Sequence, residues 1–383
     1  MSQEQKNNSC RLFKRCGGCQ LAMSYDEQLS WKQERVTRRF GKYTTPEAII
    51  GMDKPYNYRN KVTACVRTNS RKDIISGVFQ SSTNTVIATD DCMLEDKKAQ
   101  KIVKELKKLM RAFKIMPYDM NTGRGLIRYF LIRHAAATGE IMVCIVTASP
   151  IFPAKNNFIK ALLKACPEVT TVVMNVSASA KLMLSSDERV MYGKGYIEDI
   201  LCGKRFRISA RSFYQVNPIQ TQKLYETAIE FADLKSEDTL LDAYCGIGTI
   251  GIVAAQKVKR VIGVENNKDA IRDAKVNAKL NKVNNISFYC ADAGEFVQEL
   301  SQSDEKIDVV IMDPARQGSG ENFLTSVTKL SPRNIVYVSC NIETQERDIK
   351  LLIKDGYKII KVQPVDMFPH TNHIECVILL TRK

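Results

Sequence analysis

The chain is poor in histidine and tryptophan and has no long apolar run. Its 383 residues include three histidines and one tryptophan. No apolar stretch reaches the roughly 18 residues that a membrane-spanning helix needs, and segment 1–9 lacks the apolar core of a secretory signal peptide. The sequence therefore predicts a cytoplasmic protein with no role for a membrane.

Acidic residues are outnumbered by basic ones. The 57 lysines and arginines stand against 42 aspartates and glutamates, which gives a formal net charge of +15 at pH 7. Such a charge favours a polyanionic partner, either nucleic acid or an anionic membrane. Because no membrane segment is evident in the sequence, nucleic acid is the preferred interpretation.

Basic charge is concentrated in segment 97–114, which holds eight lysines and arginines and one acidic residue. Apolar residues recur there at helical spacing, at Ile102, Leu106, Leu109 and Phe113. The pattern predicts an amphipathic helix with a basic face. That face is either a contact surface for nucleic acid or a solvated surface, and the sequence leaves both open.

Three parts with different patterns follow one another along the chain. Residues 1–45 carry closely spaced cysteines and a polar helix-like stretch, and residues 46–204 contain short alternating strand runs around the basic helix. Residues 205–383 alternate strands and helices, which is typical of a doubly wound sheet. The predicted fold class is α/β: a Rossmann-like domain in 205–383, an α+β central domain and a small N-terminal cysteine segment.

The strands expected in residues 205–383 are 239–243, 260–265, 286–291, 307–312, 334–339, 358–362 and 376–381. Helices fill most of the gaps, for example 270–280 and 344–354. The last two strands are joined by residues 364–374, a link too short for a helical crossover. The domain should therefore end in an antiparallel hairpin.

A glycine-rich turn follows the first of these strands. Residues 246–251 match the pattern G-x-G-x-x-G, and Glu265 ends the next strand about 20 residues on. Such a turn lets a ligand approach the backbone closely, while the acidic residue can accept hydrogen bonds from ribose hydroxyls. The pattern alone does not separate NAD from S-adenosylmethionine (SAM). Asp242, placed to serve the cationic methionine end of SAM, and the polar strand end at Asp313 favour SAM.

Twelve cysteines are present, and three of them, Cys10, Cys16 and Cys19, share one short glycine-containing segment. In a large chain of this kind, cysteines indicate metal binding, catalysis or small buried side chains more often than disulfides. A tetrahedral metal site or a cubane cluster needs a fourth ligand, for which Cys92 in a polar turn is the best candidate. The spacing alone leaves an iron–sulfur cluster and zinc as alternatives.

Another cysteine, Cys340, follows the buried run 335–339 at the sheet edge where ligands bind in open α/β folds, and Glu375 precedes a later apolar run. A thiol at such an edge can act as a nucleophile, and a nearby carboxylate can accept a proton. A helix expected soon after Cys340 would favour its thiolate. His370 and His373 have no evident third ligand, so loop ordering or RNA contact is preferred over metal binding.

Together these motifs resemble those of the RNA uracil-5-methyltransferase family over nearly the whole chain. The resemblance rests on Cys-x5-Cys-Gly-Gly-Cys from Cys10 with Gln28-Leu29 and Lys32 after it, Tyr58-Arg59-Asn60-Lys61, Ser212-Phe213-Tyr214-Gln215-Val216-Asn217-Pro218, Asp242-Ala243-Tyr244-Cys245-Gly246-Ile247-Gly248-Thr249, Asp313-Pro314-Ala315-Arg316, Val338-Ser339-Cys340-Asn341 and Met367-Phe368-Pro369-His370-Thr371-x-His373-x-Glu375. So many motifs in the same order argue against a chance match.

The resemblance implies Cys340 as nucleophile, Glu375 as base and a [4Fe–4S] cluster on Cys10, Cys16, Cys19 and Cys92. It implies SAM as methyl donor, bound by Gln215, Tyr244, Thr249, Glu265, Asp292 and Asp313. The implied substrate is a uridine of 23S ribosomal RNA, since bacterial tRNA members generally lack the cysteine motif. A uridine in the T-loop of tRNA is the alternative, because the small β-barrel that opens many ribosomal members is expected to be absent.

Two functions of other classes fit the sequence less well. An RNA-binding or RNA-chaperone protein with incidental methylation would not need an intact thiol and carboxylate. An NAD-dependent oxidoreductase would leave that pair without a role. The protein is expected to act as a monomer, and a flipped-out uridine would need stacking surfaces, for which Tyr56, Tyr58, Phe213 and Tyr214 are candidates.

Overall fold

The computed structural model describes residues 10–80, 83, 85–179 and 184–382. The chain divides into two compact units. The first comprises Met1–Ala22, Pro55–Ile200 and Arg207–Arg211, and the second comprises Met23–Lys54, Leu201–Phe206 and Ser212–Lys383. The hairpin of β8 (Ile197–Leu201) and β9 (Lys204–Ile208) has residues in both units.

Helix α3 (Tyr25–Phe40) belongs to the second unit, whereas the sequence-based division at residue 45 groups it with the cysteines. A capping box starts the helix: Glu27 accepts from the backbone N–H of Ser24 at 2.7 Å, and Ser24 accepts in return. Val36 and Phe40 are fully buried in the core of the second unit. The polar stretch therefore has an apolar side that docks on the second unit.

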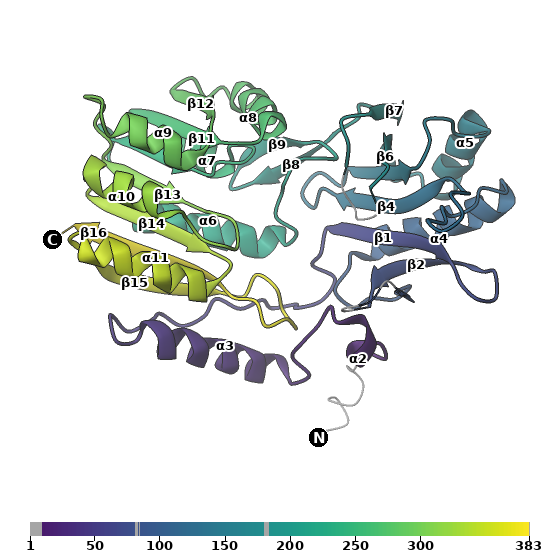
Figure 1. Cartoon of the computed structure of the whole chain (residues 1–383), viewed down its shortest axis with the longest axis horizontal. Coiled ribbons are helices and arrows are strands. Elements are labelled where there is room, and N and C mark those ends of the chain that lie inside the picture. Colours follow the sequence, from purple (N-terminus) through teal and green to yellow (C-terminus); the bar gives the residue numbers. More distant parts are fainter. Residues whose placement is uncertain (1–9, 81–82, 84, 180–183, 383) are drawn as a thin grey trace. The chain divides into compact units, whose positions relative to one another are not determined.

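One sheet dominates the first unit, with the strand order β3-β2-β1-β4-β5-β6-β7. Its strands are β1 (Lys61–Thr68), β2 (Ile74–Phe79), β3 (Val86–Ala88), β4 (Ile127–His134), β5 (Ile141–Thr147), β6 (Val169–Val176) and β7 (Glu188–Tyr192). Neighbours pair antiparallel except β5 and β6, which are parallel and joined through α5 (Lys155–Ala165). Figure 1 shows α4 (Lys97–Ala112) and α5 beside each other at this sheet.

The predicted basic helix is confirmed as α4, with its apolar side packed on the sheet. Ile102 and Leu106 are fully buried, whereas Leu109 and Phe113 are partly buried beside the same core. Its lysines pair with carboxylates, as in Lys101–Glu168 at 3.1 Å, Lys104–Asp91 at 2.6 Å and Lys108–Glu105 at 2.7 Å. Part of the basic charge is thus already paired within the first unit.

The second unit is built on a sheet with the strand order β12-β11-β10-β13-β14-β16-β15. Its strands are β10 (Thr239–Ala243), β11 (Arg260–Glu265), β12 (Ile286–Cys290), β13 (Val309–Met312), β14 (Asn334–Ser339), β15 (Tyr357–Val365) and β16 (Glu375–Arg382). Strands β10 to β14 are parallel, and the winding direction reverses between β10 and β13. Since β16 runs antiparallel to both β14 and β15, the predicted doubly wound sheet and final hairpin are confirmed.

The final hairpin is longer than the sequence predicted. The strands expected at 358–362 and 376–381 extend to Val365 and Glu375, which pair with each other at the end of the ladder. The backbone groups of the two strands stay paired beyond the apolar runs 358–362 and 376–381, from which the strands were predicted. Glu375 consequently lies at the paired end of a strand, where the loop of residues 366–374 joins it, rather than within that loop.

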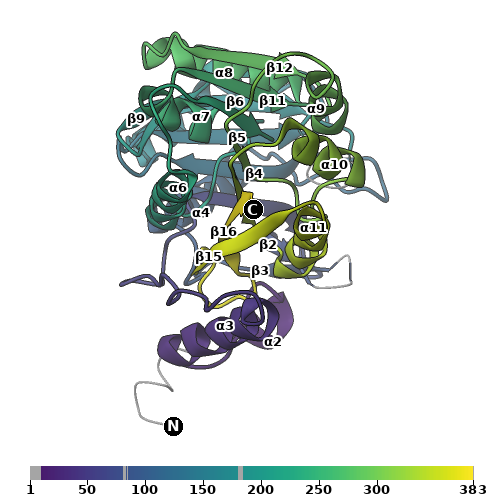
Figure 2. The same ribbon diagram turned by 90° about the vertical axis from the view of Figure 1, so that its left-hand side faces the viewer.

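Helices cover both faces of the second sheet, as Figure 2 shows. One face carries α6 (Pro218–Ala232), α7 (Thr249–Ala254) and α8 (Lys268–Leu280), and the other carries α9 (Ala293–Leu300), α10 (Glu321–Leu330) and α11 (Ile342–Lys354). Helix α3 packs beside α11 and the edge strand β15. Tyr337 and Phe323 are among the largest side chains of the core. Within the described residues, no helix is long and apolar enough to cross a bilayer, and the cytoplasmic location stays a prediction.

Candidate active site

The predicted site residues of the second unit follow the carboxyl ends of its parallel strands. Tyr244 follows β10, Glu265 ends β11, Asp292 follows β12, Asp313 follows β13 and Cys340 follows β14. Parallel strands present their carboxyl ends at one edge, so the topology brings these residues to the same edge. Ligands of doubly wound sheets bind there, where the winding direction reverses.

The glycine-rich turn between β10 and α7 has a left-handed backbone. The φ angle is 64° at Tyr244, 56° at Gly246 and 81° at Gly248. A Cβ atom at Gly248 would lie 2.8 Å from the ring of Phe288, so the position excludes larger residues on steric grounds as well. The turn predicted from the sequence is therefore present in the conformation that requires its glycines.

Two carboxylates hold this turn in place. Asp242 accepts a hydrogen bond from the N–H of Gly251 at 2.8 Å, and Glu265 accepts one from the N–H of Gly246 at 3.2 Å. Burial, followed by the charges of Asp313 and Glu265, raises the pKa of Asp242 to about 7. The sequence assigned Asp242 to the methionine end of SAM, but its carboxylate is buried and supports the turn.

The other predicted cofactor residues occupy three separate segments. Thr249 begins α7 and donates its hydroxyl hydrogen to Tyr225 Oη at 3.3 Å. Asp292 caps α9 and accepts from the N–H of Gly294 at 2.8 Å. Gln215 is half-buried in the segment before α6. Thr249 and Asp292 thus have structural partners that orient them.

Tyr244 is oriented by a buried network that the sequence did not reveal. Its hydroxyl lies 3.0 Å from Ser319 Oγ. Asp348 of α11 accepts from the N–H of Ser319 at 2.8 Å and from the hydroxyl of Tyr337 at 2.6 Å. A signal was available, because Asp348 is a polar residue beside the apolar Ile349 on the inner side of an amphipathic helix. The network ties the turn after β10 to the helix that follows Cys340.

Cys340 lies in an open cleft of about 500 Å³ in the second unit. Most of the cleft's lining is polar, and it consists of Cys340, Arg35, Arg316, Asn341, Ile342, Glu343, Asn372, His373 and Ile374. Asn341 caps α11 by accepting from the N–H of Glu343 at 3.0 Å, so the thiol stands one residue before the cap, as predicted. Since β14 is buried along its whole length, the nucleophile candidate stands on a rigid support.

The electrostatics of the cleft disfavour the thiolate. Burial, together with the charges of Glu375 and Asp313, raises the pKa of Cys340 to about 12, while Arg316 acts in the opposite direction. The prediction that the following helix would supply a thiolate is therefore wrong for the protein without ligands. Desolvation and two nearby carboxylates outweigh the helix terminus and one arginine.

Glu375 is brought to the same place by strand pairing. Ser339, the residue before Cys340, pairs with Cys376, the residue after Glu375. Burial, followed by the charge of Asp313, raises the pKa of Glu375 to about 8. A carboxyl group whose pKa lies near neutrality is suited to exchange a proton with a substrate. The structure thus joins the two residues that the sequence proposed for catalysis.

Arg316 is a site residue that the sequence analysis left without a role. It lines the cleft, and its charge lowers the pKa of both Cys340 and Glu375. Its guanidinium lies 2.9 Å from Nδ1 of His373. The available signal is its position just after the strand end at Asp313, within the motif Asp313-Pro314-Ala315-Arg316.

The two neighbouring histidines face different partners. His370 Nδ1 lies 3.2 Å from Gln28 Nε2, and the backbone N–H of His370 donates to Gln28 Oε1 at 2.8 Å. His373 instead contacts Arg316. Separate partners of this kind support the loop-ordering role over a metal pair.

The four cysteines proposed as metal ligands, Cys10, Cys16, Cys19 and Cys92, all belong to the first unit. Burial, followed by the charges of Cys92, Cys16 and Cys10, raises the pKa of Cys19 to about 12, and Arg59 opposes this shift. The N–H of Gly18 donates to Cys16 Sγ at 3.3 Å, just after α2 (Phe13–Cys16). The other three thiols therefore lie near enough to Cys19 for their charges to act on its pKa. Across the described residues, however, no three His, Cys, Asp or Glu side chains are arranged to hold a metal ion.

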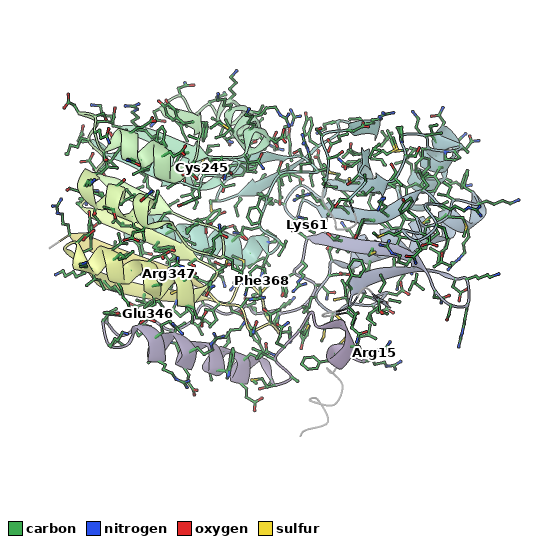
Figure 3. The ribbon with its side chains drawn as sticks, in the orientation of Figure 1. Arg15, Lys61, Cys245, Glu346, Arg347 and Phe368 are labelled. Atoms are coloured by element: carbon green, nitrogen blue, oxygen red, sulfur yellow. The ribbon has the colours of Figure 1, made fainter. Side chains whose placement is uncertain are left out.

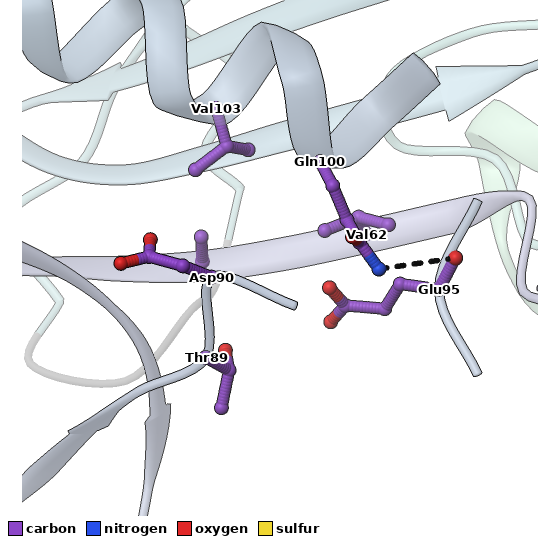
Figure 4. A pocket seen from close by; sticks show the side chains of 7 residues that line it. Val62, Thr89, Asp90, Glu95, Gln100 and Val103 are labelled. Atoms are coloured by element: carbon purple, nitrogen blue, oxygen red, sulfur yellow. Dashed lines mark hydrogen bonds between the residues drawn. The ribbon is translucent and has the colours of Figure 1, made fainter. Parts of the chain in front are cut away.

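A small, partly open pocket of about 230 Å³ lies between β1 and α4 (Figure 4). It is lined by Val62, Ala64, Thr89, Asp90, Glu95, Gln100 and Val103. The amide of Gln100 donates to the carbonyl oxygens of Cys92 and, at 3.2 Å, of Glu95. Burial raises the pKa of Glu95 to about 7. These contacts fix the turn that presents the fourth candidate ligand.

The aromatic residues proposed to stack on a base differ widely in exposure. Phe213 is 68% exposed, whereas Tyr58 and Tyr214 are each 6% exposed. A buried ring cannot offer its face to a nucleobase, so the assignment of those two tyrosines is corrected. Phe213 keeps the role as a prediction.

Comparison with known proteins gives a consistent result. A family model described as tRNA (Uracil-5-)-methyltransferase matches residues 24–383. An uncharacterized RNA methyltransferase of Halalkalibacterium halodurans is 42% identical over 382 residues, which covers 98% of this chain and 83% of that protein. Another from Clostridium tetani is 40% identical over 378 residues, which covers 97% of this chain and 82% of that protein.

A solved structure extends this likeness to the fold. The crystal structure of Pyrococcus abyssi tRNA (uracil-54, C5)-methyltransferase in complex with S-adenosyl-L-homocysteine has a TM-score of 0.80 and 29% sequence identity. The match covers 94% of this chain and 84% of that chain. This chain therefore belongs to the tRNA (uracil-5-)-methyltransferase family and is an RNA methyltransferase.

Proposed function

We propose that the protein transfers the methyl group of SAM to carbon 5 of a uridine in RNA, with Cys340 as nucleophile and Glu375 as proton acceptor. One observation carries the proposal: strand pairing places a thiol and a carboxyl group with a near-neutral pKa beside each other at the ligand-binding edge. An RNA-binding protein without catalysis would have no use for this pair.

The chemistry needs both groups because carbon 5 of uracil is a poor nucleophile. Addition of the Cys340 thiolate to carbon 6 forms an S–C bond and leaves an enolate, whose carbon 5 can then take the methyl group. Glu375 next removes the carbon-5 proton. The electrons of that C–H bond restore the ring double bond, and the C–S bond breaks to release the Cys340 thiolate.

The residues at the sheet edge fit a cationic methyl donor. Asp313 and Glu375 are neighbouring acidic groups whose pKa values burial raises to about 7 and about 8. SAM supplies an electrophilic methyl group on a positively charged sulfur. Because a nearby positive charge lowers the pKa of a thiol or a carboxyl group, Cys340 and Glu375 would both ionise more readily beside such a ligand.

The RNA substrate is proposed to be 23S ribosomal RNA, on the strength of the cysteine motif. A tRNA is the second candidate, because the structure with a TM-score of 0.80 is of a tRNA methyltransferase. Mapping 5-methyluridine in ribosomal RNA and tRNA, from cells with and without the gene, decides between them. Loss from 23S RNA supports the first candidate and loss from tRNA alone the second, whereas no loss in either would overturn the proposed function.

We also propose a [4Fe–4S] cluster on Cys10, Cys16, Cys19 and Cys92. The chemistry of the donors supports this proposal, since four cysteine thiolates are the usual ligands of such a cluster and the charges of the other three thiols act on the pKa of Cys19. Each thiol must lose its proton to bind iron, and Arg59 favours that ionisation at Cys19. The role we assign to the cluster is structural, because it would join the N-terminal segment to the turn that carries Cys92.

Iron analysis tests the cluster. Protein prepared without oxygen should be brown and contain about four irons and four sulfides per chain. Cys16→Ser should lower the iron content and the melting temperature without changing SAM affinity. Cys290→Ser, at an exposed cysteine, is the control and should keep wild-type iron. Stoichiometric zinc in colourless protein would contradict the cluster.

The basic face of α4 is proposed to contact RNA phosphates. Lys101, Lys104 and Lys108 are 54%, 40% and 65% exposed in their side chains, and exposed ion pairs of this kind exchange partners at little cost. Reversing all three to glutamate should raise KM for RNA and leave SAM affinity unchanged. The slope of log affinity against log salt should flatten by about 0.7–0.9 for each phosphate that the variant no longer binds.

A matched triple variant controls for net charge in this experiment. Lys155, Lys160 and Lys164 are exposed on α5, and reversing them changes the charge of the first unit by the same amount. If this variant lost as much RNA affinity as the α4 variant, the effect would be one of overall charge. Unchanged affinity and salt slope in the α4 variant would show that its basic face is only solvated.

A further inference from the structure

A row of polar side chains on α3 holds the loop that leads to Glu375. Tyr25, Gln28 and Lys32 are spaced three and four residues apart, so they lie on one face of the helix. All three contact the segment after β15, residues 366–374, which we call the clamp loop. Gln28 and Lys32 belong to a motif that the proposed function leaves without a task.

Lys32 is the centre of this row. Its Nζ donates to Asp366 Oδ1 at 2.5 Å and to the carbonyl oxygen of Phe368 at 3.2 Å. Figure 3 labels Phe368 in this loop. The other carboxylate oxygen of Asp366 accepts from the hydroxyl of Tyr25 at 2.8 Å. Both charged side chains have an exposed fraction of 0%, so the contact excludes water.

Gln28 holds the next part of the clamp loop. Its side-chain amide contacts His370 through both the backbone N–H and the imidazole. The φ angle of His370 is 68°, a left-handed conformation that is unfavourable for a residue with a side chain. Side chains of α3 therefore keep the loop backbone in a shape that it would not adopt alone.

The energetics of the Lys32–Asp366 pair indicate a positional role. Desolvation of two buried charges offsets most of their attraction, so such a pair adds little net stability. Removing one partner, in contrast, leaves an unpaired buried charge. What the pair does supply is a fixed geometry between α3 and the clamp loop.

We propose that Lys32, acting through Asp366 and Phe368, is a positioning residue that sets Glu375 for the proton-removal step. The clamp loop continues from these contacts to His373, which touches Arg316 in the cleft, and leads directly into Glu375, the first residue of β16. The inference rests on the proposed role of Glu375 as proton acceptor.

Loss of the clamp should slow one step more than the others. A catalytic group misplaced by about 1 Å can slow its step by about 10²-fold. The thiol is carried by β14 and the cofactor turn by β10, so addition and methyl transfer should depend less on the clamp loop, although Asn372, His373 and Ile374 of this loop line the same cleft. Methylated RNA should then stay attached to Cys340, because its carbon-5 proton is removed slowly.

Lys32→Met tests the proposal by removing the charge and keeping the length of the side chain. We expect methylated RNA to accumulate as a covalent adduct on a denaturing gel, with turnover down by about 10²-fold and SAM affinity unchanged. Because an unpaired Asp366 could weaken folding, the double variant Lys32→Met with Asp366→Leu replaces the pair by apolar side chains and should fold. It should still trap the adduct.

Two further variants complete the test. Tyr25→Phe removes the hydrogen bond that Tyr25 donates to Asp366 and the one that it accepts from the N–H of Met52. It leaves the Lys32–Asp366 pair in place and should trap a smaller fraction of adduct. Lys350→Met removes an exposed lysine that pairs with Glu346 in the same unit and should behave as wild type.

Wild-type turnover without adduct in the double variant would overturn the proposal. Equal slowing of methyl transfer and of the release of methylated RNA from Cys340, without adduct, would also overturn the proposal. The contacts between α3 and the clamp loop would then support the whole site rather than Glu375 alone. Both results differ from failure of the proposed function, which is tested on the wild-type protein. If the wild-type protein formed no 5-methyluridine in RNA, the proposed function itself would be wrong.

Discussion

Replacing Cys340 by alanine should abolish methyl transfer to uridine, with turnover at least about 10⁴-fold lower, the scale of losing a catalytic nucleophile. Without the thiol nothing adds to carbon 6, and carbon 5 remains too weak a nucleophile to take the methyl group. SAM affinity should be unchanged, since the cofactor turn lies between β10 and α7. Incorporation of labelled methyl groups into RNA measures the first effect, and calorimetric titration with SAM measures the second.

Cys202→Ala is the matched control for this prediction. Cys202 lies between β8 and β9, outside the cleft, and its replacement should keep wild-type turnover. Wild-type activity of the Cys340 variant would exclude the covalent mechanism.

The same chemistry predicts a rise of kcat/KM for RNA between about pH 7 and about pH 9. Burial raises the pKa of Cys340 to about 12 and that of Glu375 to about 8. Cys340 acts as a thiolate before the irreversible methyl transfer, so its thiolate fraction, which grows as the pH increases, raises kcat/KM. Glu375 acts after that step in its deprotonated form, and its titration contributes to kcat instead. A decline of kcat/KM across the same interval would contradict this assignment of protonation states.

Replacing Glu375 by glutamine should trap the enzyme on its RNA. Glutamine keeps the size of the side chain but does not take up the carbon-5 proton, so the C–S bond to Cys340 cannot break. Methyl transfer should still occur once per enzyme, while turnover falls by about 10²–10⁴-fold, the usual contribution of a general base. A denaturing gel with labelled RNA measures the adduct, and single-turnover kinetics measure the methyl transfer.

Glu299→Gln provides the control for this experiment, because Glu299 is an exposed residue of α9. It should form no adduct and should turn over as wild type does. A Glu375 variant that is slow but free of adduct would assign the proton to another acceptor.

Local signals explain how much of the second unit could be predicted. The run at 334–339 is β-branched and apolar, and it forms a strand with those bounds. Gly246 and Gly248 lie close together in the sequence and predict a turn, and both have the positive φ angles that such a turn needs. The position of Cys340 at a strand end followed from the same short stretch of sequence. Each of these features depends on neighbours along the chain, which a sequence displays directly.

Contacts between distant segments could not be predicted in the same way. Lys32 and Asp366 are 334 residues apart, and nothing in either neighbourhood indicates that they form a buried pair. The prediction of a Cys340 thiolate was wrong for a related reason. The pKa of this thiol depends on burial and on the charges of Glu375 and Asp313, which come from other parts of the sheet. The assignment of α3 to the second unit likewise depended on the packing of Val36 and Phe40.

The protonated resting state of Cys340 has a consequence for the durability of the enzyme. Peroxides and alkylating agents react with thiolates far faster than with thiols. A cysteine whose burial raises its pKa to about 12 should therefore survive oxidants even though it lines an open cleft. Cys340 should therefore become reactive only in the complex with its substrates, and protein without substrates should be oxidised slowly.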